Sequence, residues 1–109
     1  MANSFKTVTD TAVGTSPATI YTCPAATETT IIGLNVANIL SVSITVDVQL
    51  ENNDGDNVYL VKDAIVPVGS ALVAVGGDQK IVMNASDVLK VTASQASAAD
   101  VTMSILEIT

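Results

Sequence analysis

The sequence has no histidine and no arginine among its 109 residues. Histidine is the commonest general base and the commonest protein ligand for metals, so its absence removes the usual starting point of both kinds of site. Arginine forms the bidentate clamp that holds phosphate and carboxylate groups, and that clamp is also excluded. We therefore expect no enzyme activity, no catalytic residue, no metal site and no cofactor.

Aromatic residues and cysteine are scarce. There is no tryptophan and the aromatic fraction is 3%, which leaves few platforms on which bases or sugars could stack. The single cysteine, Cys23, cannot form an internal disulfide. Because no histidine exists to activate its thiol and no lysine lies within ten residues, we expect a buried structural cysteine.

Charged residues are few and mostly of one sign. Eleven acidic residues against four lysines give a net charge of −7. Nucleic acids and anionic membranes are both held by basic side chains, so we expect neither as a partner. The longest apolar stretch, 31–40, is half the length of a membrane span, and residues 1–6 lack the apolar core of a signal peptide. We expect synthesis in the cytoplasm without export.

What the chain does contain is typical of an all-β fold. Its length fits one domain, and 49% of its residues are hydrophobic. Valine, isoleucine and threonine make up 38 of the 109 residues, and such β-branched side chains favour strands. In 42–50, five apolar residues alternate strictly with polar ones, which predicts that all five lie on one face of a strand.

Short strands with turn signals between them follow along the whole chain. We predict strands at 4–13, 18–22, 29–36, 42–50, 58–63, 71–75, 79–83, 88–93 and 101–108. The segments 52–57 and 66–70 are predicted turns, and 94–99 a loop with room for a short helix. This spacing predicts a single-domain antiparallel β-sandwich or jelly roll of about eight strands, with 1–12 as an N-terminal arm or edge strand and 13–109 as the sandwich.

One segment resembles a calcium loop. Oxygen-bearing side chains alternate at Asn52, Asp54 and Asp56, as at the start of an EF-hand. The glycine that this motif requires at its sixth position is replaced by Asn57, so a solvated hairpin tip is the favoured interpretation. The remaining acids are spaced too widely to pair and are interpreted as a solvated surface.

The hydropathy of the chain indicates assembly. The mean hydropathy is +0.51, which is high for a small domain with much surface per volume. We expect some apolar surface to be covered by another subunit. The Ser/Thr-rich start of the chain is of a kind that often orders against a partner.

The residues together resemble small virion structural proteins of tailed bacteriophages, of the marine and cyanobacterial type. The matching segments are MANSFK (1–6), IYTCPA (20–25), IGL (32–34) with Ala37 and Asn38, VDV (46–48), YLVKD (59–63), PVGSAL (67–72), DVLKVT (87–92) and DVTMSILEI (100–108). They cover nearly the whole chain and mark strands and turns. Such relatives often carry glycine where Ser86 stands here.

The resemblance implies a non-enzymatic component of the virion. The implied role is a capsid decoration, or cement, protein that binds the major capsid protein on the outside of the head as a homotrimer. Two alternatives stay open: a neck, collar or tail adaptor that binds neck and tail proteins, and a receptor- or carbohydrate-binding β-module. The candidate contact residues for a partner are Ser4, Phe5, Lys6, Thr7, Asn53, Asp54, Asp56, Gly76, Gly77 and Asp78.

Overall fold

The computed structural model describes residues 3–76 and 79–109, and all regular structure there is β-strand. Nine strands are present in this part of the chain. They are β1 (Asn3–Val13), β2 (Ala18–Thr22), β3 (Glu28–Asn38), β4 (Ile44–Glu51), β5 (Asn57–Val66), β6 (Ala71–Val75), β7 (Ile81–Met83), β8 (Val88–Ala93) and β9 (Ala99–Ile108).

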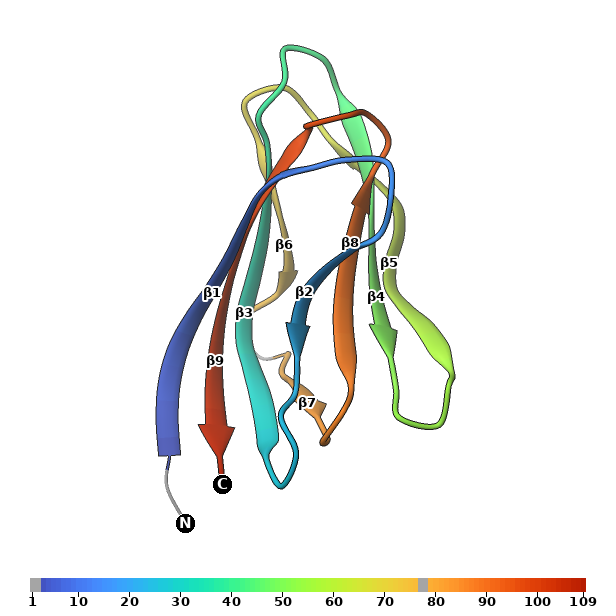
Figure 1. Cartoon of the computed structure of the whole chain (residues 1–109). Coiled ribbons are helices and arrows are strands. Elements are labelled where there is room, and N and C mark those ends of the chain that lie inside the picture. The colour runs from blue at the N-terminus through green and yellow to red at the C-terminus, as the bar shows by residue number, and fades with distance from the viewer. Residues whose placement is uncertain (1–2, 77–78) are drawn as a thin grey trace.

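The strands form two antiparallel sheets that face each other (Figure 1). Sheet A has the order β1–β9–β3–β6, and β7 pairs with β3 beside β6. Sheet B has the order β2–β8–β4–β5. The chain crosses repeatedly between the sheets, and the first and last strands, β1 and β9, lie side by side in sheet A. This strand order is that of a jelly roll. The predicted fold class is confirmed.

Alternating side chains from both sheets fill the space between them. From sheet A, Ile31, Leu34, Met103 and Ile105 are buried, and from sheet B the buried residues include Val46, Val48, Leu89 and Val91. Successive strand residues point to opposite faces, so each strand supplies every second side chain to the core. Burial of about 25 cal/mol for each Å² of apolar surface stabilises this arrangement.

The predicted strands match those observed, apart from their ends. Val42 was expected to share the buried face of 42–50, but β4 begins at Ile44 and Val42 is half exposed. The predicted strand 79–83 contains a shorter β7, Ile81–Met83. Residues 94–98 form turns without a helix, because Ser97 has a positive φ of 51° that a right-handed helix does not allow.

The predicted turns join strands as expected. The segment 52–56 connects β4 to β5, and the amide of Ser70 donates to the carbonyl of Pro67 between β5 and β6. Ser86 has a φ of 73°, a left-handed conformation that glycine adopts without strain. Glycine at this position would suit the same turn.

Candidate interaction surface

The outer face of sheet A carries exposed apolar side chains from three strands. Phe5 on β1 is 77% exposed, Val73 on β6 is 66% exposed and Val82 on β7 is 59% exposed. Phe5 is paired with Leu106 of β9, which is paired in turn with Thr30 of β3. Directly paired residues point to the same side of a sheet, so this row faces away from the core.

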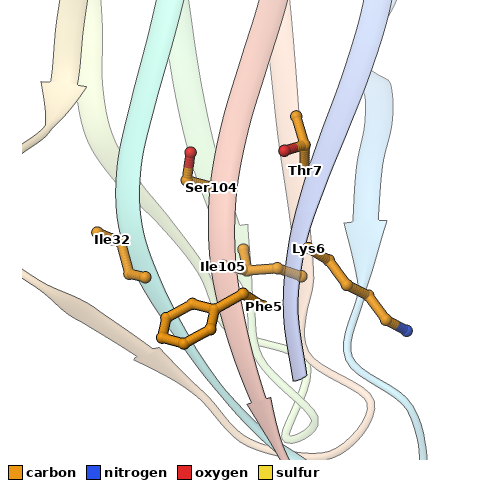
Figure 2. A pocket seen from close by; sticks show the side chains of 6 residues that line it. All are labelled: Phe5, Lys6, Thr7, Ile32, Ser104 and Ile105. Carbon is orange, nitrogen blue, oxygen red and sulfur yellow. The ribbon is translucent and has the colours of Figure 1, made fainter. Parts of the chain in front are cut away.

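A shallow hollow of about 270 Å³ lies on this face beside Phe5. Figure 2 shows the ring of Phe5 reaching across β9 toward Ile32 of β3, while Lys6 points the other way. The lining residues are Phe5, Lys6, Thr7, Ile32, Ser104 and Ile105. An aromatic ring that stands this far out of a folded domain loses apolar burial, which a partner could restore.

The outer face of sheet B combines ion pairs with an exposed apolar residue, because Ile65 of β5 is 70% exposed and pairs with the outward-facing Thr45. Asp47 and Glu51 alternate on β4 with the buried residues Ile44, Val46 and Val48. Lys90 of β8 lies 3.1 Å from the Glu51 carboxylate, and Lys62 of β5 lies 3.6 Å from that of Asp47. Both outer faces thus carry exposed apolar side chains, and the ion pairs of Lys62 and Lys90 distinguish sheet B from sheet A.

A polar cluster closes the sandwich beside β1. Glu107 of β9 is 6% exposed, yet its carboxylate lies 2.7 Å from the ammonium of Lys6 and accepts a hydrogen bond from the Tyr21 hydroxyl. These two hydrogen bonds hold the pKa of Glu107 below its ordinary value. Burial of Tyr21, together with its hydrogen bond to Glu107, raises the pKa of the tyrosine well above its usual range.

This cluster was not expected from the sequence, where the acids were interpreted as a solvated surface. That interpretation is wrong for Glu107 and for Asp87, which is 4% exposed. A signal for Glu107 exists, because it continues the alternation Val101, Met103, Ile105 along β9. A carboxylate placed in an inward-facing position needs partners, and Lys6 and Tyr21 supply them.

Cys23 is buried, as predicted, with 1% of its surface exposed. Its Sγ atom lies 3.3 Å from the carbonyl oxygen of Thr27 and 3.3 Å from the hydroxyl oxygen of Thr29. The thiol is therefore enclosed within the fold by the ends of β2 and β3.

The candidate contact residues lie in separate places. Ser4, Phe5, Lys6 and Thr7 lie on β1 at the edge of sheet A, whereas Asn53, Asp54 and Asp56 lie at the tip between β4 and β5 of sheet B. Gly76 follows β6 at the opposite edge of sheet A. Gly77 and Asp78 lie outside the described residues. The fold thus leaves β1 as one continuous group of four candidates.

The resemblance of 52–56 to a calcium loop has a structural explanation. The Oδ1 atom of Asn52 accepts hydrogen bonds from the amides of Asp54 and Asp56, both at 3.0 Å. Asp87 accepts the amide of Asn53 at 3.0 Å and that of Asn84 at 2.9 Å, which ties the tip to the turn before β8. The side-chain oxygen of Asn52 thus shapes the hairpin tip. Within 3–76 and 79–109 no three acidic or cysteine side chains gather as metal ligands would.

Comparison with known proteins gives a likeness of fold. No family model matches the chain, and no curated protein matches it. One similar solved structure comes from Bacillus endospore appendages, described as a novel family of disulfide-linked pili. The TM-score is 0.53 at 14% identity, over 96% of this chain and 85% of the other. At this identity the likeness shows the fold alone. The described residues include no helix of the length and hydropathy that would cross a membrane.

Proposed function

We propose that this chain is a non-enzymatic structural subunit of a multi-copy assembly, and that the assembly is the outer surface of a phage head. The observation that carries the proposal is the apolar outer face of sheet A, where Phe5, Val73 and Val82 stand exposed on a rigid β-sandwich. Covering a face of this kind with a second protein surface lowers the free energy, because apolar surface is removed from water.

Three further observations support a structural role. A similar fold occurs in a subunit of pili, which are themselves assemblies of many copies. The titratable residues Lys6, Glu107 and Tyr21 contact one another within the fold, which is a structural use of these groups. An acidic chain without arginine would be repelled by packaged DNA and suits the exterior of a head. The resemblance to virion proteins adds the decoration role, the capsid partner and the homotrimer, and these finer points stay predictions.

The proposed assembly is non-covalent. The pili in the comparison are described as disulfide-linked, whereas Cys23 is the only cysteine of this chain and is enclosed in its core. Contacts between copies must therefore come from apolar burial, strand pairing and charge.

The alternative of a carbohydrate-binding module is less well supported. Its aromatic platform would have to come from Phe5, Tyr21 and Tyr59. Phe5 lies in sheet A, whereas Tyr59 lies on β5 of sheet B beside Lys62, whose ammonium is 4.8 Å from the ring centre. The Tyr21 hydroxyl is bonded to Glu107 and Thr29. The three rings thus form no common surface.

Antibody labelling of purified phage particles tests the proposal. Gold label spread over the outer head surface is the expected result. Label confined to the neck or tail would replace decoration with the adaptor role, and particles without the protein would overturn the virion assignment. A saturable hit on a glycan array would favour the binding-module alternative.

A further inference from the structure

β1 lies at an open edge of sheet A, and its first eight residues are regular. Its residues from Asn3 to Asp10 pair with β9 in unbroken register, from Ile108 to Val101. Eight residues in this conformation extend about 27 Å. In the described part of the chain β9 is the only strand that pairs with β1, so alternate N–H and C=O groups of β1 face outward without a strand partner. Such an edge is a template for another strand.

The other sheet edges are short or irregular. In sheet B, β2 has five residues, a register shift between Thr19 and Tyr21, and Pro17 directly before it. The opposite edge strand, β5, has two register shifts, and Asp63 on it has a positive φ of 54°. In sheet A, β6 has five residues and β7 has three. Short strands, bulges and prolines are the devices that prevent edge pairing.

β1 has protective features of its own. The register shift between Asp10 and Val13, where Ala12 has a positive φ of 56°, limits strand addition to the part of β1 before residue 11. In that part, Lys6 is an edge lysine whose side chain is turned to the inner side of the sheet. Inward-turned charges normally discourage strand addition, because an incoming strand would desolvate them. Here the charge is already matched, since the Lys6 ammonium lies 2.7 Å from Glu107. Lys6 therefore opposes strand addition only weakly, and it favours an incoming strand that carries an acidic side chain.

We propose that residues 6–10 of β1 pair antiparallel with the same residues of a second copy of this chain, about a two-fold axis that passes at Val8. This inference rests on the proposed self-association and names the strand that performs it. It extends sheet A across two subunits, and it predicts an isologous dimer rather than the homotrimer that the resemblance implies.

The charges of β1 select this partner and this register. Lys6, Val8 and Asp10 share the inner side of the sheet, because they pair with the buried residues Ile105, Met103 and Val101. With Val8 opposite Val8 of the second copy, Lys6 of each copy stands opposite Asp10 of the other. A shift by two residues that centres the axis on Lys6 would place two lysines opposite each other, which is unfavourable. The strand is thus complementary to itself.

The residues of β1 that point away from the core offer a direct test of the register. Thr7 and Thr9 point outward, paired with Ser104 and Thr102. In the proposed register Thr7 of one copy lies opposite Thr9 of the other, within the distance that a disulfide bridges. A chain with Thr7→Cys alone would place its two new thiols on the diagonal, about 7–8 Å apart, which is too far.

The test is disulfide formation under mild oxidation, followed by non-reducing electrophoresis. An equimolar mixture of Thr7→Cys and Thr9→Cys chains should shift from the 11.1 kDa band to one of twice that mass. Each variant alone should remain at 11.1 kDa, as should the unchanged chain, whose Cys23 is buried. Val8→Cys alone should also give the double-mass band, because Val8 faces its own counterpart across the axis.

The outcomes separate this inference from the proposed function. If the unchanged chain is oligomeric by light scattering but neither the mixture nor Val8→Cys links, β1 is not the contact, while self-assembly stands. Equal linking by Thr7→Cys alone would overturn the register. A monomer at all concentrations would overturn the β1 contact, whereas labelling of particles would still decide the virion role.

Discussion

The ammonium of Lys6 and the carboxylate of Glu107 lie 2.7 Å apart, although Lys6 is on the exposed edge strand and Glu107 is buried. The contact joins the first strand of the fold to the last. Tyr21 of sheet B donates to the same carboxylate, so one acidic group ties β1, β9 and β2 together where the sandwich would otherwise be open.

Acid should weaken the contacts of Glu107 with Lys6 and Tyr21. Because the pKa of Glu107 is lowered in the folded chain, its contribution to stability is present above the ordinary carboxyl pKa near 4.5 and is lost as the pH falls through the folded-state value. Glu107→Gln should lower the free energy of unfolding at pH 7 by about 1–3 kcal/mol. It should also flatten the fall of the melting temperature as the pH drops below the ordinary carboxyl pKa near 4.5. Thermal denaturation across this range, with exposed Asp54→Asn as control, measures both effects. An unchanged acid profile in Glu107→Gln would contradict this role.

Asp87 should hold the tip between β4 and β5. Its carboxylate accepts the amides of Asn53 and Asn84 while it is almost fully buried. Asp87→Ala leaves both donors without that partner and should cost about 1–3 kcal/mol. The amide of Asn53 should then exchange its hydrogen faster. Exposed Asp54→Ala serves as the matched control and should change stability by no more than about 0.5 kcal/mol. Equal effects of the two substitutions would rule out the anchoring role.

Cys23 should be unreactive in the folded protein. A thiol reagent should label less than roughly a tenth of the chains under native conditions, on a time scale that labels all of them in denaturant, because the thiol is 1% exposed. Non-reducing electrophoresis of the assembled protein should show the 11.1 kDa chain alone. Rapid native labelling, or a disulfide-linked band, would contradict the proposed non-covalent assembly.

Complementary charge variants should associate with each other better than with themselves. In a homodimer, Lys6→Glu sets two carboxylates opposite each other at each contact, and Asp10→Lys sets two ammonium groups there, so each variant alone should dimerise poorly. Mixed, the two chains restore opposite charges at both contacts. Two pairs of about 0.2–1 kcal/mol each should tighten the mixed dimer roughly 2- to 30-fold.

Analytical ultracentrifugation of the two variants, separately and mixed, measures this preference. Melting temperatures must be measured alongside, because Lys6→Glu also sets a second carboxylate near Glu107 and should loosen the fold. Mixed chains that associate no better than the separate ones would remove the charge selection from the account.

The sequence predicted the strands well because alternation is a local property. In β4 the polar residues Thr45 and Asp47 separate Ile44, Val46 and Val48, and the sandwich buries the apolar set. Val42 continues the same alternation, yet it precedes the strand and stays exposed, because no local pattern says where the neighbouring strand ends.

Pairings between distant strands could not be predicted in the same way. Lys6 and Glu107 are about a hundred positions apart, and only the jelly-roll order brings β1 beside β9. Turns held by left-handed residues other than glycine, such as Ala26 and Ser86, also give no clear signal. For the same reason the burial of Glu107 and Asp87 emerged from the structure, whereas β1 was already a candidate for contact with a partner.

Light scattering of the purified, unmodified chain over a range of concentrations tests the central claim most directly. A self-assembling subunit that pairs through β1 predicts a mass of two 11.1 kDa chains that falls toward one on dilution. A mass of one chain at every concentration would contradict self-association of the free protein and would leave the apolar face of sheet A to be covered by another partner.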